Sequence, residues 1–389
     1  MNRIVSRLRP FGETVFATMT ARAVEHGAIN LGQGFPDTDG PARMLEIARE
    51  EIAAGNNQYG PGRGLPELRA AVARQQERRY GLHYDPTTEV LVTVGATEAI
   101  TATVLGLVEP GSEVIVTEPY YDAYAAAIAL AGATRVSVPL RADGATWALD
   151  GAAIRAAVTD RTALIILNNP HNPTGSVFTP EQLQSLADVV VEFDLPVLSD
   201  EVYEYLVFDG LSHTPLASLP GMRERTVTVS SAAKTFNATG WKTGWALASP
   251  ELLDAVVGAK QFLTYVGATP FQPAVAHALD NEEPWVADMV AGLQSNRDRL
   301  TEALRAAGFQ VHHSPGSYYV VADISSLGHA DAAKFCLDLP EHIGVAAIPV
   351  QAFCDDTEPW RTKVRFAFCK RPEIMEEAVE RLRGFAAGR

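Results

Sequence analysis

The sequence predicts an α/β protein in which a large lobe with a mostly parallel sheet is joined to a smaller α+β lobe. Between residues 89 and 229, short apolar runs rich in β-branched residues alternate with stretches of helical character. This alternation is typical of a parallel sheet covered by helices on both faces. After about residue 285 the alternation ends, and a long helical stretch is followed by mixed strands and helices, which indicates the second lobe.

The individual elements follow from apolar periodicity and from Pro and Gly at helix ends. The strands predicted for the large lobe are 89–94, 113–117, 134–138, 162–167, 196–199 and 226–229, and its clearest helices are 65–80, 97–108, 121–132 and 180–193. The small lobe is predicted to hold helices at 285–307, 330–339 and 372–387 and strands at 317–324, 345–350 and 363–368, while helices at 14–26 and 41–55 come first in the chain. We therefore expect an N-terminal segment (1–45) that joins the small lobe, a large domain (46–284) and a small domain (285–389).

Composition narrows the class of protein. The net charge of −15 and the absence of a Lys/Arg run argue against nucleic-acid binding. The three cysteines, Cys336, Cys354 and Cys369, form neither a disulfide framework nor a C-x-x-C metal motif. The sequence has no signal-peptide pattern and no apolar run long enough to span a membrane. We expect a cytoplasmic protein that binds no metal, nucleic acid or membrane.

Polar residues follow the predicted strands, at the edge where ligands bind in parallel sheets. Ala96 and Thr97 lie where a strand gives way to a helix, so free N–H groups and the helix dipole predict an anion site there. Tyr121 follows the next strand and could stack on a planar ring, although a tyrosine at a strand end is more often only packed. Asn168 and Asn172 lie in the proline-rich segment 168–175, which restricts the loop and can aim a side-chain amide at a ligand oxygen.

The last two predicted strands are followed by the ionisable residues of the site. Asp200 follows an apolar strand, where a carboxylate needs a cationic partner such as a protonated ring nitrogen, and Tyr203 lies three residues later. Lys234 follows the final strand, where loss of water favours a neutral, nucleophilic amine, although alone it could equally be a surface lysine. Ser231 and Lys242 flank it as possible phosphate-binding groups. Together these strand ends predict a site for pyridoxal phosphate, a cofactor that a lysine holds as a Schiff base.

Over essentially its whole length, the chain resembles the class I/II aminotransferases of fold type I. It is most similar to bacterial N-succinyldiaminopimelate aminotransferases and to the kynurenine/glutamine/methionine aminotransferase group. The motifs that carry the resemblance are LGQGFPD (31–37), NQYGPGRG (57–64), VTVGATEAI (92–100), EPYYDAY (118–124), NNPHNPTG (168–175), DEVYE (200–204), SSAAKTFNATGWKTGW (230–245) and VRFAFCK (364–370).

The resemblance implies a role for most of these residues. Lys234 would be the Schiff-base lysine and Asp200 the partner of the ring nitrogen, while Asn172 and Tyr203 would contact the ring hydroxyl and Tyr121 would stack. The phosphate would be held by Ala96, Thr97, Ser231 and Lys242, and Asn168 would also line the cofactor site. Many relatives carry arginine at the position of Lys242. Lys242 would therefore contact the phosphate as a single point charge, without the two parallel hydrogen bonds that an arginine can form. The Asn172–Pro173 bond is expected to be cis.

The resemblance also implies substrates and an assembly. Arg365 would bind the α-carboxylate of an amino acid or 2-oxo acid, beside Gly34 and Phe16. Kynurenine enzymes usually have tryptophan in place of Phe16, which argues against a kynurenine preference. Tyr59 and Tyr265 match residues that reach the site of a neighbouring subunit, so a homodimer is expected.

The expected reaction is a ping-pong amino transfer with Lys234, Asp200 and Tyr203 as catalytic residues. The leading substrate is N-succinyldiaminopimelate with the 2-oxoglutarate/glutamate couple, and Arg22, Arg63 and Lys260 are candidate partners for its distant carboxylate. The alternatives are a broad-specificity glutamine/methionine/kynurenine-type aminotransferase and, on the same fold, a cysteine-conjugate β-lyase.

Three other classes of protein fit the sequence poorly. S-x-x-K (231–234) and K-T-G (242–244) lie too close together for a penicillin-binding serine enzyme, and S-D-N is absent. The glycines at 60–64 break the G-x-G-x-x-G pattern of an NAD enzyme. A regulator on this fold would need an added DNA-binding domain, for which the sequence before Thr14 has no room.

Overall fold

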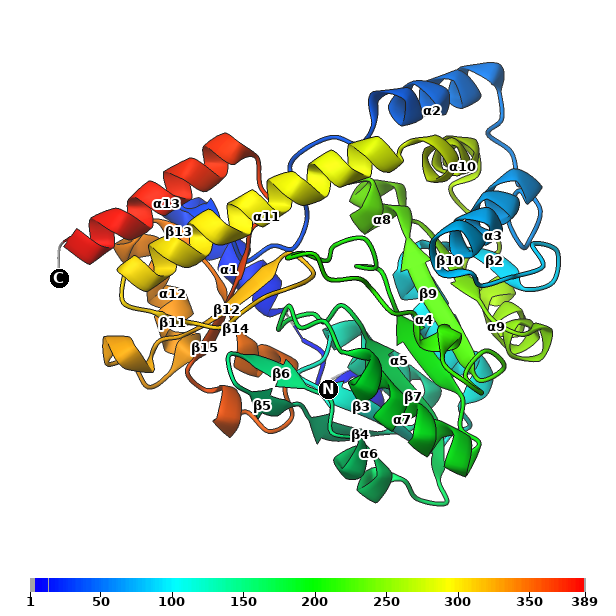
Figure 1. The fold of residues 1–389 in the computed structure, drawn as a ribbon, viewed down its shortest axis with the longest axis horizontal. Helices are drawn as coiled ribbons and strands as arrows, with labels where there is room; N and C mark the ends of the chain where they lie inside the picture. The colour runs from blue at the N-terminus through cyan, green and yellow to red at the C-terminus, as the bar shows by residue number, and fades with distance from the viewer. Residues whose placement is uncertain (1–3, 13, 388–389) are drawn as a thin grey trace.

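The structure, a computed structural model, describes residues 4–12 and 14–387 and has two lobes (Figure 1). The larger lobe is built on a seven-stranded sheet in the order β2-β10-β9-β8-β7-β3-β4. Its strands are β2 (Val90–Val94), β3 (Glu113–Glu118), β4 (Thr134–Pro139), β7 (Thr162–Asn168), β8 (Val197–Asp200), β9 (Thr226–Ser231) and β10 (Thr243–Leu247). A small hairpin, β5 (Arg141–Asp143) and β6 (Thr146–Ala148), lies outside this sheet.

The sheet is parallel except at β10, which runs antiparallel to both β2 and β9. Both faces are buried, because alternate residues of one strand pack into different apolar clusters. In β3, Val114 and Val116 belong to one cluster and Ile115 to another. Burial on both faces explains why the strands appear in the sequence as continuous apolar runs.

Helices cover both faces of the sheet. Those of the large lobe are α3 (Pro66–Tyr80), α4 (Gly95–Leu107), α5 (Asp122–Ala131), α6 (Gly151–Ala157), α7 (Pro180–Phe193), α8 (Ala232–Thr235), α9 (Pro250–Leu263) and α10 (Gln272–Asn281). Residues of α4, α5 and α9 share one cluster with the sheet, and residues of α6 and α7 share the other. The predicted fold class, an α/β protein with a mostly parallel sheet and a second α+β lobe, is confirmed.

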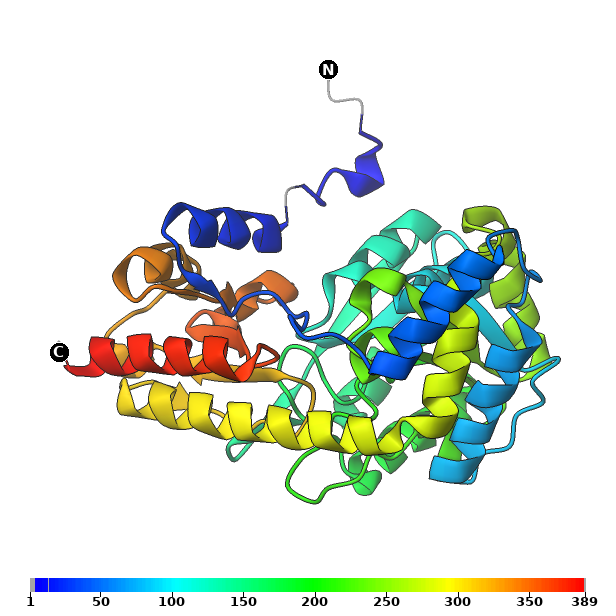
Figure 2. The same cartoon turned by 90° about the horizontal axis from the view of Figure 1, so that it is seen from above.

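The smaller lobe has a four-stranded sheet in the order β11-β12-β15-β14. Its elements are α11 (Glu283–Ala306), β11 (Gln310–Val311), β12 (Tyr319–Asp323), α12 (Ala332–His342), β13 (Val345–Ala346), β14 (Ile348–Pro349), β15 (Lys363–Ala367) and α13 (Pro372–Ala387). Figure 2 shows α11 and α13 side by side along this lobe, with α11 reaching towards the large lobe.

The N-terminal segment contacts both lobes. α1 (Val15–Glu25) and β1 (Ile29–Asn30) lie on the small lobe, where β1 pairs with β13, whereas α2 (Ala42–Ala54) packs against α10 of the large lobe. The expected domain boundaries at 45/46 and 284/285 stay predictions, and each falls inside a helix, α2 or α11. The chain between β1 and α2 crosses from one lobe to the other and brings residues 31–38 to the region where the lobes meet.

Candidate active site

A cavity of about 410 Å³ lies at the carboxyl ends of the parallel strands and is closed on one side by the small lobe. Most of the predicted site residues line it, namely Phe16, Gly34, Ala96, Thr97, Tyr121, Asn168, Asn172, Asp200, Tyr203, Ser231, Lys234, Lys242 and Arg365. The parallel strands β3, β7, β8 and β9 direct their carboxyl ends to the same edge, so residues distant in the sequence meet there.

One end of the cavity is formed by the start of α4. Gly95 has a φ of +72°, and a Cβ added there would lie 3.2 Å from Nζ of Lys242. Gly244 of β10 is equally constrained, because its Cβ would lie 2.6 Å from the carbonyl carbon of Gly95. The two glycines let the backbones of β10 and α4 approach closely. The free N–H groups of the first turn of α4, the Lys242 ammonium and Ser231 together make this end suited to an anion.

The cavity floor carries Asp200 at the end of β8. Tyr124 donates a hydrogen bond to Asp200 Oδ2 at 2.5 Å, and the N–H of Val202 donates to Oδ1 at 3.3 Å. Burial raises the pKa of Asp200 to about 6, and the bond from Tyr124 opposes that rise. A carboxylate held this way is suited to a cationic N–H group.

Asn168 and Asn172 define the loop next to the floor. Asn168 Nδ2 donates to the carbonyl of Asp200 at 2.9 Å, and its Oδ1 accepts the N–H of Asn172 at 2.7 Å. Both ends of the Asn168 amide are therefore used within the protein and hold the loop in place. The peptide bonds before Pro119, Pro170 and Pro173 are cis, and the last is the one expected from the sequence.

Lys234 lies in α8 directly after β9, and its side chain is half-buried at the cavity wall. Its Nζ donates to the hydroxyl of Tyr318 at 2.7 Å and to the carbonyl of Gly34 at 3.3 Å. Burial lowers the pKa of Lys234 to about 8, against the opposing effects of Cys369 and Asp200.

Arg365 of β15 faces the cavity from the small lobe and is 1% exposed. Its Nη1 donates to Asn172 Oδ1 at 2.9 Å and its Nη2 to the carbonyl of Gly32 at 2.8 Å, while Nε is buried without a partner. The guanidinium carbon lies 4.1 Å from the ring centre of Tyr319. A buried guanidinium with an unused N–H suits a bound carboxylate.

Two predicted residues lie outside this cavity. Tyr59 and Tyr265 are 81% and 48% exposed, and their rings meet edge-on with centroids 5.6 Å apart. Their expected reach into a neighbouring subunit stays a prediction.

The three cations considered for a distant substrate carboxylate also lie away from the cavity lining. Arg22 donates to the carbonyl of Leu337, and Arg63 pairs with Asp254. Lys260 is 2% exposed and donates to the carbonyls of Gly62 and Tyr265. All three have partners within their own chain.

The sequence interpretation missed several polar residues at or next to the site, Thr239 among them. Gln33, Asp122, Tyr124 and Tyr319 line the cavity, and Tyr318 bonds to Lys234 from behind its wall. The sequence did offer a pattern for Tyr124, because this residue follows Tyr121 by three positions and lies in the first turn of α5. Tyr318 and Tyr319 begin a predicted strand of the other lobe, and no local pattern connects them to Lys234.

Comparison with known proteins decides the family. The family model described as aminotransferase class I and II matches residues 26–382. The chain belongs to this family. It is 56% identical over 386 residues to a probable N-succinyldiaminopimelate aminotransferase of Mycobacterium tuberculosis, and the match covers 97% of each chain. A solved structure of N-succinyldiaminopimelate aminotransferase from M. tuberculosis superposes with a TM-score of 0.96 at 56% identity, covering 98% of this chain and 100% of that one. A methionine aminotransferase of Escherichia coli is 38% identical over 97% of both chains.

The chain is therefore an aminotransferase of fold type I, whose substrates are small molecules, amino acids and 2-oxo acids, and its family uses pyridoxal phosphate. The cavity fits that cofactor. Gly95, Gly244 and Lys242 make one end of the cavity suited to a phosphate, Asp200 offers a carboxylate suited to a ring nitrogen, and Lys234 offers an amine. Among the described residues, no helix has the length and apolar character needed to cross a membrane, and no group of three or more His, Cys, Asp or Glu could hold a metal ion.

Proposed function

We propose that this aminotransferase exchanges the amino group of glutamate with the keto group of the 2-oxo acid that corresponds to N-succinyldiaminopimelate, and catalyses the reverse transfer. The observation that carries the proposal is the 56% identity, over 97% of both chains, to an enzyme named for this substrate. The same cavity also supplies the groups that amino transfer needs.

The cofactor-binding roles follow from the chemistry of each group. When bound, pyridoxal phosphate supplies a ring that accepts the electrons left on a substrate α-carbon after its proton departs. Asp200 keeps the ring nitrogen protonated, and Asn172 and Tyr203 hydrogen-bond the ring hydroxyl oxygen. Tyr121 stacks on the ring. The phosphate is held by Ala96, Thr97, Ser231 and Lys242, with Asn168 holding the adjacent loop.

We propose Lys234 as both the cofactor-bearing residue and the proton carrier. With a pKa of about 8, an appreciable fraction of its amine is neutral near pH 7.5 and able to take a proton. Nζ then takes the proton from the substrate α-carbon and delivers it within the site. Burial supplies most of the required pKa change.

Arg365 binds the substrate α-carboxylate in this proposal, with Gly34 and Phe16 shaping the space beside it. Gly34 must lack a side chain, since a Cβ there would lie 1.9 Å from the Tyr319 hydroxyl. The distant carboxylate of a succinylated substrate would be read by groups other than Arg22, Arg63 and Lys260, because these are engaged outside the cavity.

We further propose a homodimer in which Tyr59 and Tyr265 of one copy complete the site of the other. Exposed aromatic side chains support this arrangement, because Phe262, 86% exposed, lies in the same part of the chain as Tyr265. Exposed aromatic groups are typical of protein interfaces. A cytoplasmic location remains an expectation from the sequence.

The test is a steady-state assay with purified enzyme and 2-oxoglutarate. The donors are N-succinyldiaminopimelate, free diaminopimelate, methionine, glutamine and kynurenine. We expect kcat/KM for the succinylated donor to exceed that for each other donor by at least about 100-fold, the discrimination that a few buried polar contacts provide. A kcat/KM for methionine that equals or exceeds that for the succinylated donor would instead favour the activity of the 38% identical methionine aminotransferase. Pyruvate release from a cysteine conjugate, without amino transfer, would indicate a β-lyase.

A further inference from the structure

The Tyr318 hydroxyl connects three segments of the chain behind the cavity wall. It accepts a hydrogen bond from Lys234 Nζ at 2.7 Å and donates one to the carbonyl of Gly34 at 2.5 Å. Lys234 belongs to the large lobe, Gly34 to the segment that crosses between lobes, and Tyr318 to the turn before β12. One hydroxyl therefore fixes the amine relative to both lobes.

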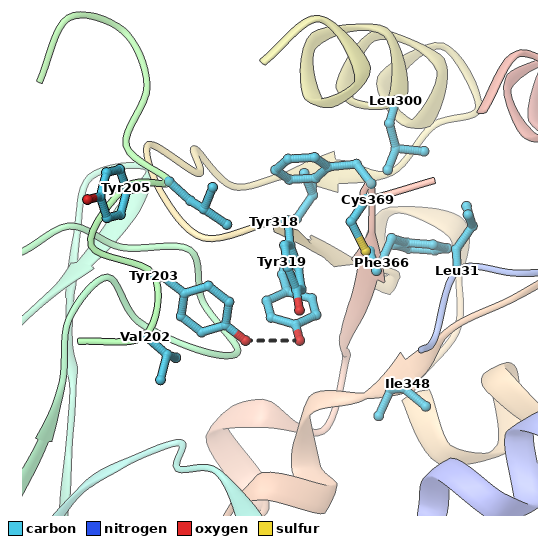
Figure 3. Packing of buried hydrophobic residues seen from close by; sticks show 14 of the residues in the cluster. Leu31, Val202, Tyr203, Tyr205, Leu300, Tyr318, Tyr319, Ile348, Phe366 and Cys369 are labelled. Carbon is cyan, nitrogen blue, oxygen red and sulfur yellow. Dashed lines mark hydrogen bonds between the residues drawn. The ribbon is translucent and has the colours of Figure 1, made fainter. Parts of the chain in front are cut away.

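The position of this ring is tightly set. Tyr318 is 1% exposed, and its ring meets those of Tyr203 and Tyr319 at centroid distances of 5.2 and 4.8 Å. Figure 3 shows Tyr318 among buried side chains that include Cys369, with its ring beside that of Tyr319. The N–H of Phe368 donates to its carbonyl at 3.0 Å, which ties the turn to the end of β15. A hydroxyl on so constrained a ring has little freedom to move.

The direction of the hydrogen bonds determines what the amine can do. The Tyr318 proton is used by Gly34, so the Tyr318 oxygen presents a lone pair to Lys234. A neutral amine has two N–H groups and one lone pair. When its N–H groups point to the Tyr318 oxygen and the Gly34 carbonyl, its lone pair must point away from both.

We infer that Tyr318 is a positioning residue, which holds the Lys234 amine whenever it is not bonded to the cofactor and turns its lone pair away from the Gly34 carbonyl. This inference rests on the proposed role of Lys234 as the proton carrier. It assigns Tyr318 no contact with the substrate, because Tyr318 lies behind the wall that Lys234 and Gly34 form.

Other groups also influence the Lys234 amine, and a test of Tyr318 must leave them unchanged. Asp200 from β8 and Cys369 after β15 raise the pKa of Lys234, while Arg365 of β15 and Lys242 before β10 lower it. The Tyr203 ring faces Nζ with its centre 5.8 Å away. None of these groups changes in a Tyr318→Phe variant, which removes one oxygen atom and keeps the ring.

The experiment measures the pH at which the Lys234 amine becomes reactive. Full-length enzyme freed of cofactor is pulsed with formaldehyde and cyanoborohydride between pH 6 and 10, and methylation of Lys234 is quantified by peptide mass spectrometry. Wild type is compared with Tyr318→Phe and with Tyr205→Phe. The control removes a buried hydroxyl that accepts a bond from Gln75, and Figure 3 shows Tyr205 apart from the Tyr318–Tyr319 pair. Thermal unfolding of all three proteins checks that the fold is intact.

We expect the midpoint of Lys234 methylation to fall by roughly 0.5 to 1 pH unit in Tyr318→Phe, because an ammonium loses a stronger hydrogen bond than a neutral amine does. The Tyr205→Phe midpoint should match wild type. In the loaded enzyme, Tyr318→Phe should lower kcat about 10-fold and leave KM for the amino donor unchanged, as expected when orientation of a proton carrier is lost.

An unchanged or raised midpoint in folded Tyr318→Phe would overturn the inference, and so would an unchanged kcat. Failure of the proposed function gives a different result. If Lys234→Ala retains amino transfer, Lys234 is not the proton carrier, whereas the methylation midpoint still reports whether Tyr318 holds the amine.

Discussion

Lys234 and Lys260 are two lysines of the large lobe that differ in burial. Lys234 follows β9 and is half-buried, whereas Lys260, in the last turn of α9, is 2% exposed. Burial lowers the pKa of each. Lys260 donates to two backbone carbonyls, Gly62 and Tyr265, and joins two surface loops. Lys234 donates to one hydroxyl and one carbonyl and lines an open cavity.

The difference shows that burial alone does not make a lysine chemically active. Lys260 lies against polypeptide on all sides, so its ammonium serves as a fixed link between loops that carry Tyr59 and Tyr265. Lys234 has space on its cavity side for a reacting group, and its lowered pKa makes a neutral amine available there.

The largest expected effect separates the two lysines directly. Lys234→Ala should reduce kcat on the order of 10⁴-fold, because in the proposed mechanism this one side chain both bears the cofactor and moves the proton. Lys260→Met should lower the free energy of unfolding by about 2 kcal/mol, since two carbonyls lose their donor, and should lower kcat per folded molecule far less than Lys234→Ala does. Amino-transfer rates and denaturant unfolding measure the two effects. Equal losses of kcat in both variants would contradict the distinction.

Arg365 extends the comparison to a third buried cation. Its unpartnered Nε and cavity position place it with Lys234 rather than with Lys260. Arg365→Lys should lower kcat/KM about 100-fold, because a point charge cannot form the two parallel bonds that a carboxylate accepts from a guanidinium. The loss should appear for every amino donor tested. A loss confined to the succinylated donor would show that Arg365 reads the distant carboxylate instead.

Asp200 provides a pH test of the same region in the enzyme freed of cofactor. Its folded-state pKa of about 6 exceeds the unfolded value, so its contribution to stability is complete below about pH 4 and is lost as pH rises through 6. Asp200→Asn should therefore gain about 1 to 3 kcal/mol of unfolding free energy relative to wild type between pH 4 and pH 8. Urea unfolding at both pH values measures this change. A difference that does not vary with pH would argue against a raised pKa.

Tyr124 gives the smallest expected effect. Removing its hydrogen bond to Asp200 destabilises the ionised carboxylate and should weaken its hold on a ring nitrogen. Tyr124→Phe should lower kcat about 10-fold and weaken cofactor binding by a similar factor, which corresponds to one charge-assisted hydrogen bond. Kinetics and cofactor titration, with Tyr205→Phe as the matched control, measure both. A wild-type kcat and a wild-type cofactor affinity in Tyr124→Phe would show that Tyr124 plays no part in the site.

Much of the fold could be predicted from the sequence because five strands of the large sheet, β2, β3, β7, β8 and β9, are buried on both faces. β10 was not predicted, because the segment Thr243–Leu247 directly follows the glycine and lysine residues of a turn. Its place between β2 and β9 comes from pairing with residues far away in the chain. The same limit applies to the hairpin of β5 and β6, whose strands are three residues each.

The site could be predicted where residues follow parallel strands, since topology brings such strand ends together. It could not be predicted where a group arrives from the other lobe, as Tyr318 does, 84 residues after Lys234. Lys260 illustrates a further limit. The sequence indicates a lysine on a helix, whereas the carbonyls that engage it belong to loops whose positions depend on the whole fold.

The central claim, that Lys234 is the lysine used for chemistry, can be tested directly. Enzyme loaded with pyridoxal phosphate is reduced with borohydride, which makes the bond between cofactor and lysine permanent, and the modified peptide is identified by mass spectrometry. We predict one pyridoxyl group per chain, on the peptide that contains Lys234, with Lys242 and Lys260 unmodified. A pyridoxyl group on Lys242 or Lys260, or incorporation that persists in Lys234→Ala, would contradict the account.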